Sequence, residues 1–351
     1  MIRSCASSGV RWRTPVAALA WLQLSAQEPG TQSGLLRDVV FTDYTPLSSN
    51  LELARRLLTP LNAASLPRRL ASSGKTLAEQ PIELSAERFI VYVPPTPPRE
   101  GYALLAFVPP WPQASLPRGW AAALDRQGVI FVSAARSGNE ESVLARREPL
   151  ALLGAHNIMQ RYPVDPGRVY VGGFSGGARV AMRLALAYPD FFRGAILNAG
   201  SDPIGSADIP LPPSDLFERF QSSTRLVYLT GEHDDPHVAD DAVSVQSMRH
   251  WCVFDLESFT IPRAGHEVAD AAALSRALEA LRARARPDAA KLSRCRAALG
   301  TELAKGFERI DALIAGGRSR DAQPLLRTLD ERFGGLAAPH SLELAQKYFA
   351  R

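Results

Sequence analysis

The sequence predicts an α/β protein built on a doubly wound, mostly parallel sheet with helices on both faces. Two observations predict this fold. Short runs of β-branched and aromatic residues, apolar at successive positions, recur along the chain. Helix-like stretches separate these runs, which is the alternation that parallel strands require. The 351 residues are enough chain for one large domain and an appendage.

The elements follow in chain order. A short helix is expected over 51–58, followed by a Pro- and Ser-containing connection. The predicted strands are 89–93, 102–108, 129–134, 169–172, 195–198, 226–230 and 259–261. The predicted helices between and after them lie around 120–126, 150–161, 178–188 and 270–286. Helices in these positions would cover both faces of the sheet.

The last part of the chain has a different pattern. After Pro287 no strand-like run occurs. Apolar residues recur every three or four positions, namely Leu299, Leu303, Phe307, Ile310 and Leu313. Glycine pairs at 316–317 and 334–335 divide this region into about three helices. We therefore expect a small helical appendage over 287–351, packed on the main domain.

The N-terminus has the layout of an export signal. Arg3, Arg11 and Arg13 precede a short apolar run over 15–24, and small residues follow it. This pattern predicts a cleaved signal over 1–26 and an exported protein, periplasmic or secreted. Without cleavage the protein would be cytoplasmic.

The remaining chain divides into an extension over 27–84 and a main domain over 85–286. Removal of the signal would also remove Cys5. Cys252 and Cys295 would then form an even pair that could be bridged in an oxidising compartment, although spacing does not show that they meet.

The composition excludes several classes of protein. The net charge of +4 is small for this length, and the basic residues are scattered rather than clustered with aromatic residues. No apolar run reaches the roughly 18 to 20 residues that a membrane-spanning helix needs. We expect no nucleic-acid partner and no integral membrane segment.

The most specific motif is Gly173-Phe-Ser175-Gly-Gly177, which matches G-x-S-x-G. A predicted strand runs into it and an amphipathic helix runs out, which is the context of a nucleophile elbow. Ser175 is therefore the candidate nucleophile, and the Gly176 N–H is a candidate oxyanion donor. The alternative is a glycine-rich turn without chemistry.

A base and an acid are expected further along the chain. The strand 226–230 leads to Asp234 and Asp235, and the strand 259–261 leads to His266. All of these positions lie at the same edge of the sheet as Ser175. His266 is the candidate base and Asp234 the candidate acid that orients it. Asp235 is the alternative acid, and Asp202 is a more distant one.

The same region raises a competing hypothesis. A metal cluster could involve Glu232, His233, Asp234, Asp235 and His237. Their spacing matches no helical H-E-x-x-H arrangement, and no distant ligand suggests itself. We expect no metal ion and no cofactor.

The segments 164–171 and 176–191, together with these motifs, resemble the α/β-hydrolase superfamily. More narrowly, they are similar to esterases related to polyhydroxybutyrate depolymerases and feruloyl esterases. The resemblance covers roughly 85–286. It implies a triad of Ser175, Asp234 and His266, and hydrolysis of a small ester or a polyester through an acyl-enzyme.

One loop departs from that family, whose members usually carry His-Gly after the strand that precedes the oxyanion loop. Here the loop contains three prolines without an N–H: Pro109, Pro110 and Pro112. Trp111 or Gln113 could supply the second oxyanion donor instead. The alternative function is a catalytically weak or inactive binding or scaffold protein. A second loop, 137–140, is either a wall of the substrate pocket or simply an ordered loop.

Overall fold

The computed structural model describes residues 32–283 and 288–349. The predicted signal over 1–26 lies outside the described residues and stays a prediction. Within the described ranges, no helix is both long and apolar enough to cross a membrane.

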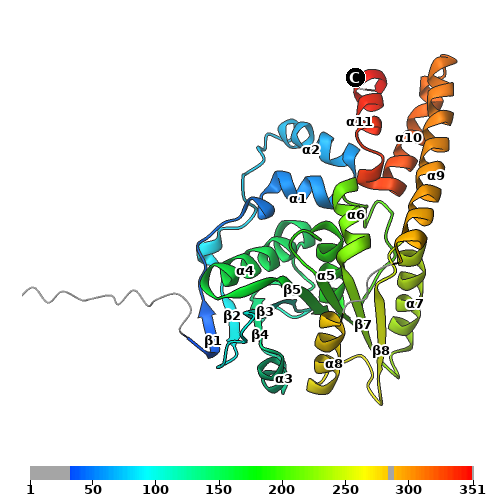
Figure 1. Ribbon diagram of the computed structural model, residues 1–351. Coiled ribbons are helices and arrows are strands. Elements are labelled where there is room, and N and C mark those ends of the chain that lie inside the picture. The colour runs from blue at the N-terminus through cyan, green and yellow to red at the C-terminus, as the bar shows by residue number, and fades with distance from the viewer. Residues whose placement is uncertain (1–31, 284–287, 350–351) are drawn as a thin grey trace, which may run out of the picture.

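The core of the molecule is one eight-stranded sheet with the order β1-β2-β4-β3-β5-β6-β7-β8 (Figure 1). Its strands are β1 (Gly34–Val39), β2 (Phe89–Val93), β3 (Tyr102–Val108), β4 (Val129–Ala134), β5 (Val164–Phe174), β6 (Gly194–Asn198), β7 (Arg225–Gly231) and β8 (Leu256–Ile261). In the order of the sheet, every neighbouring pair from β4 through β3, β5, β6 and β7 to β8 is parallel. Strand β2 pairs antiparallel with both β1 and β4. The predicted mostly parallel sheet is confirmed.

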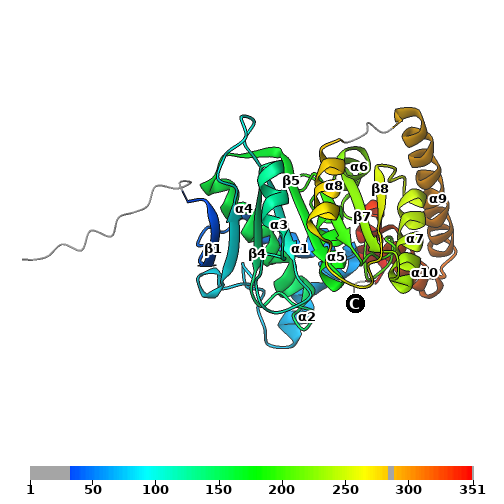
Figure 2. The ribbon, with the colours of Figure 1, turned by 90° about the horizontal axis from the view of Figure 1, so that it is seen from below.

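Helices cover both faces of this sheet, so the strands are buried on both sides. The helices are α1 (Asn50–Leu57), α2 (Pro60–Ser72), α3 (Trp120–Gln127), α4 (Glu148–Arg161), α5 (Gly176–Ala187), α6 (Ser214–Ser223), α7 (Asp235–His250), α8 (Ala271–Arg282), α9 (Ala289–Ala315), α10 (Ser319–Phe333) and α11 (His340–Leu344). On one face, α3 and α8 lie side by side and form one core with the sheet (Figure 2). On the other face, α4 and α5 form the larger core, which also takes up α1 and α6.

The N-terminal extension contains two elements that the sequence analysis missed. Strand β1 extends the sheet at its edge, and its side chains alternate between exposed and half-buried rather than forming an apolar run. The segment expected to be a connection after the first helix is helix α2, so that expectation was wrong. Thr59 caps α2, and Pro60 occupies its first turn, where a missing N–H costs no helical hydrogen bond.

The C-terminal helices pack on the main domain as expected. Leu299 and Ile310 of α9 and Phe333 of α10 belong to the same core cluster as α5 and α6. A disulfide between Cys252 and Cys295 joins the end of α7 to α9. Helix α11 lies beside α2, so the C-terminal helices contact the N-terminal extension at one end of the molecule (Figure 1).

Candidate active site

Ser175 sits in a sharp turn between β5 and α5. Its backbone has φ +54° and ψ −125°, a conformation that a non-glycine residue rarely adopts. The flanking glycine is required because a Cβ on Gly173 would lie 2.6 Å from the backbone nitrogen of Ala178. The turn therefore holds the serine hydroxyl at the carboxyl edge of the sheet, at the N-terminus of a helix.

Two further side chains form a hydrogen-bonded chain that ends at this hydroxyl. The Nε2 atom of His266 lies 3.0 Å from Ser175 Oγ. The Nδ1 atom of the same ring lies 2.8 Å from Asp234 Oδ2. Asp234 follows β7 and His266 follows β8, so the parallel strands deliver all three residues to one edge. The structure thus brings Ser175, His266 and Asp234 into one hydrogen-bonded chain.

Asp234 is buried, yet its surroundings favour the charged form. Burial raises the pKa of this carboxyl, but hydrogen bonds from His237 and His266 outweigh burial and leave the pKa below its usual value. An ionised Asp234 can hold the Nδ1–H tautomer of His266, which leaves Nε2 free to accept a proton.

A second imidazole shares the same carboxylate. His237 Nδ1 lies 2.7 Å from Asp234 Oδ1, the oxygen that does not contact His266. The rings of His237 and His266 are stacked, with centroids 4.2 Å apart and planes 13° apart. From the sequence, His237 is a candidate only for a metal ligand. The sequence feature that could have indicated this contact is the position of His237, three residues after Asp234 at the start of α7.

The other candidate acids lie elsewhere. Asp235 is exposed on the first turn of α7, and the structure gives it no contact with His266. Asp202 is paired with Arg179. Of these three aspartates, Asp234 is the one that contacts the His266 imidazole.

The cluster considered for a metal is only partly assembled. Glu232 accepts a hydrogen bond from the Arg263 N–H at 2.8 Å, and His233 is exposed. Within the described part of the chain, Asp234, His237 and His266 do present ligand atoms within 4.8 Å of one another. Both carboxylate oxygens of Asp234 are hydrogen-bonded to the two imidazoles.

The proline-containing loop after β3 lies against the start of α5. A Cβ on Gly177 would come within 2.8 Å of the Val108 carbonyl carbon. The loop is held through its carbonyl groups, each bonded to the chain between β4 and α4. The Pro110 and Pro112 oxygens accept from the backbone N–H groups of Asn139 at 3.0 Å and Arg136 at 2.6 Å.

A buried arginine completes this attachment. Arg147 donates to the Pro109 carbonyl at 3.1 Å and to the Ser137 carbonyl at 2.9 Å. Its desolvation lowers the pKa of the guanidinium from its ordinary value. Arg147 thus ties the proline-containing loop and the 137–140 loop together beneath the carboxyl edge of the sheet.

The two predicted donors of this loop differ in their surroundings. The Trp111 indole Nε1 donates to Ser115 Oγ at 3.1 Å, so the indole is already engaged, and Gln113 is exposed. The backbone N–H of Trp111 belongs to the peptide unit whose carbonyl accepts from Asn139. In a trans peptide the two groups point in opposite directions, so this N–H faces away from the main chain of Asn139.

Aromatic rings border the hydroxyl on one side. The ring of Phe174 lies 4.8 Å from that of His266 and 6.2 Å from that of Trp111, measured between centroids. The side chain of His266 is 39% exposed, so this imidazole faces solvent. The site is therefore open, with an apolar wall beside the Ser175 hydroxyl.

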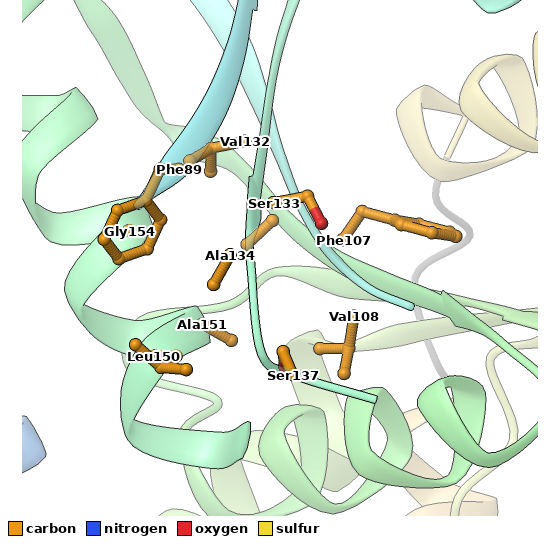
Figure 3. Close-up of a pocket in the computed structure, with 11 residues that line it drawn as sticks. Phe89, Phe107, Val108, Val132, Ser133, Ala134, Ser137, Leu150, Ala151 and Gly154 are labelled. Atoms are coloured by element: carbon orange, nitrogen blue, oxygen red, sulfur yellow. The ribbon is translucent and has the colours of Figure 1, made fainter. Parts of the chain in front are cut away.

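A small cavity lies behind this edge, between β3, β4 and α4 (Figure 3). Its lining includes Ser133, Ser137 and Leu150, and its volume is about 10 Å³. That volume holds about one water molecule and no substrate.

Comparison with known proteins gives the following relatives. No family model matches the sequence. A poly(3-hydroxybutyrate) depolymerase from Ralstonia pickettii is 29% identical over 98 residues, covering 24% of this chain and 20% of that protein. The chain therefore matches about one fifth of the length of this curated relative.

Solved structures of low identity also align. A ferulic acid esterase has 16% identity and a TM-score of 0.42, covering 56% of this chain and 92% of its own. An esterase from Pyrobaculum calidifontis has 16% identity and a TM-score of 0.41, covering 57% and 82%. S-formylglutathione hydrolase (FrmB) from Staphylococcus aureus has 12% identity and a TM-score of 0.43, covering 56% and 92%.

The sheet order, the strand–serine–helix turn and the curated match agree with one another. The chain has the α/β-hydrolase fold with a C-terminal helical appendage, and its resemblance to esterases of that superfamily is confirmed.

Proposed function

We propose that this protein is a serine hydrolase that cleaves a carboxylic ester through an acyl-enzyme intermediate. The observation that carries the proposal is the hydrogen-bonded chain from Ser175 Oγ to His266 at 3.0 Å and from His266 to Asp234 at 2.8 Å. A serine hydroxyl is a weak nucleophile at neutral pH, and this arrangement supplies the base that it needs.

In the first half of the reaction, Ser175 Oγ attacks the ester carbonyl carbon while His266 Nε2 takes the hydroxyl proton. Asp234 stabilises the imidazolium that forms. As the tetrahedral intermediate collapses, the C–O bond to the alcohol breaks and His266 returns the proton to the leaving alkoxide. The acyl group then remains on Ser175.

In the second half, water attacks the acyl-enzyme and gives its proton to His266. The bond to Ser175 Oγ breaks, the oxygen recovers the proton from the imidazolium, and the carboxylic acid is released. The same base thus serves twice, and no cofactor enters either half.

Charge develops on the carbonyl oxygen in both halves. The Gly176 N–H, at the first turn of α5, is one proposed donor to this oxyanion. The backbone N–H of Trp111 is the second, because its loop lies against the start of α5 and its carbonyl partner is bonded on the opposite side.

The proposed substrate class is an ester-containing small molecule or a polyester. The curated relative is named for a polyester, and the site is open to solvent beside an apolar wall. An open site accepts a chain that continues beyond the scissile bond in both directions.

Export is a further part of the proposal. The Cys252–Cys295 bridge is typical of an oxidising compartment, which agrees with the signal expected over 1–26. N-terminal sequencing of protein recovered from the periplasm or the medium should find a mature chain that starts near residue 27.

A fluorophosphonate probe tests the proposed function directly. The wild-type protein should be labelled at Ser175 and should hydrolyse members of an ester panel of varied acyl length, whereas Ser175→Ala should lose both properties. A folded wild-type protein that is not labelled would support the scaffold alternative. Activity that survives Ser175→Ala and disappears with a chelator would support metal-dependent hydrolysis instead.

A further inference from the structure

The proline-containing loop has few backbone N–H groups that could donate to the oxyanion. The neighbouring loop over 137–140 is a second place from which a donor could come. Asn139 of that loop donates its backbone N–H to the Pro110 carbonyl at 3.0 Å. This bond fixes Asn139 beside the proposed oxyanion loop and sets the direction in which its side chain leaves the main chain.

The side chain of Asn139 reaches the residue that follows the nucleophile. A Cβ placed on Gly176 would overlap Asn139 Oδ1 and would lie 2.9 Å from Cγ and 3.2 Å from Nδ2. The carboxamide therefore occupies the space where every other residue type at position 176 would carry its side chain. Glycine at this position lets an amide approach the proposed oxyanion donor.

The amide of Asn139 is not committed elsewhere, since it makes no hydrogen bond with any residue that the structure describes. Two buried asparagines show the contrast. Asn157 Nδ2 donates to Asp43 and Leu153 carbonyls, and Asn198 is bonded through both its oxygen and its nitrogen. Those amides are buried and structural, whereas Asn139 is exposed and its amide lies against Gly176 without a hydrogen bond to any described residue.

We propose that Asn139 is a catalytic residue whose Nδ2 donates a hydrogen bond to the oxyanion, in addition to the backbone donors of Gly176 and Trp111. This inference rests on the proposed function. A side-chain donor would compensate for a loop in which three of the five residues from 109 to 113 are prolines without an N–H. Such a donor stabilises the transition state more than the bound ester, because the charge is present only in the transition state.

The test compares Asn139→Ala and Asn139→Asp with wild type on p-nitrophenyl butyrate. Removal of one oxyanion donor should lower kcat about 100-fold and change KM by less than about threefold. Asn139→Asp keeps the size of the side chain and replaces the donor with a negative charge, so its loss should be at least as large. Asn62→Ala, the same substitution at an exposed asparagine of α2, should keep wild-type kcat.

Two measurements separate a catalytic role from a structural one. The affinity for a boronic acid, whose serine adduct resembles the tetrahedral intermediate, should fall in parallel with kcat. Gly176→Ala places a methyl group where the amide lies, so it should also lower kcat. Its effect should be less than additive with Asn139→Ala, because either change alone already removes the amide. Additive losses would contradict the contact.

The outcomes are distinguishable from a failure of the proposed function. Wild-type protein that is labelled at Ser175 and hydrolyses the ester, together with folded Asn139 variants that keep full kcat, would overturn the role of Asn139 alone. Wild-type protein that is neither labelled nor active on any ester would overturn the proposed function and this inference with it.

Discussion

At the scale of single residues, Asp234 is where the hydrogen bonds of the site converge. One carboxylate oxygen holds His266 and the other holds His237. A carboxylate fixed at both oxygens cannot rotate away from His266. We therefore propose that His237 is a positioning residue, since it is hydrogen-bonded to Asp234 and stacks on His266.

The first prediction concerns His237. His237→Ala removes one hydrogen bond to a charged carboxylate, a bond of about 1.5–3 kcal/mol, so kcat/KM for an ester should fall roughly tenfold or more. His237→Asn places Nδ2 near the position of the lost Nδ1–H and should keep kcat/KM within about threefold. Steady-state kinetics on both variants measure the difference.

The pH dependence of the activity of His237→Ala at acidic pH is a separate test of this role. Because the His237 hydrogen bond lowers the pKa of Asp234, its loss should raise that pKa, so the ionised carboxylate that holds the His266 N–H should be lost at a higher pH. Equal activity and equal profiles in wild type and His237→Ala would show that His266 is positioned without His237.

At the scale of elements, the junction of α2 and α10 contains a buried acid. Asp330 of α10 accepts the backbone N–H of Leu61 at the N-terminus of α2. Burial raises the pKa of this carboxyl to about 6 from its ordinary value of 3.8, although hydrogen bonds from Thr59 and Leu61 oppose the shift.

The second prediction follows from this raised pKa. Between about pH 4 and pH 6 the folded protein binds a proton at Asp330 that the unfolded chain has released, so the contribution of this group to stability falls as pH rises. Asp330→Asn does not titrate. The stability of the variant relative to wild type should therefore increase from pH 4 to pH 7 by about 1–3 kcal/mol.

Urea denaturation of both proteins at several pH values measures this difference in stability. The titratable groups other than Asp330 are the same in both proteins. A difference between the two proteins that is constant across pH would show that Asp330 titrates as an ordinary carboxyl.

Prediction of elements from sequence succeeded where burial was complete. Strands β2, β3 and β4 have the predicted bounds because both of their faces are covered, which leaves an uninterrupted apolar run. Strand β1 was missed because it lies at the sheet edge and carries charged residues. Helix α2 was missed because its Pro and Ser content is typical of a connection, whereas the packing of its neighbours decides its conformation.

At the scale of the whole molecule, the appendage is attached covalently as well as by packing. The disulfide joins Cys252, which follows α7, to Cys295 of α9 across a separation of 43 residues. This cross-link restricts the unfolded chain and holds the C-terminal helices to the sheet domain.

The third prediction concerns this bridge. Cys295→Ser should lower the free energy of unfolding by about 2–4 kcal/mol, the range expected when a loop of this length loses its cross-link. A reductant should destabilise the wild type by a similar amount and should leave the variant unchanged. Non-reducing mass spectrometry checks that the bridge forms. A reductant effect on both proteins would point to a cause other than this disulfide.

The sequence by itself determined the sheet, the helical appendage and the place of Ser175, because hydrophobic periodicity and a strand–serine–helix motif are properties of neighbouring residues. It also ranked Asp234 above Asp235, and the tertiary structure brings Asp234 to His266. Only the tertiary structure decided that His237 shares Asp234 and that Asn139 lies over Gly176. Those relations join loops far apart in the chain, and their geometry is set by how the strands and helices pack, which no local pattern records.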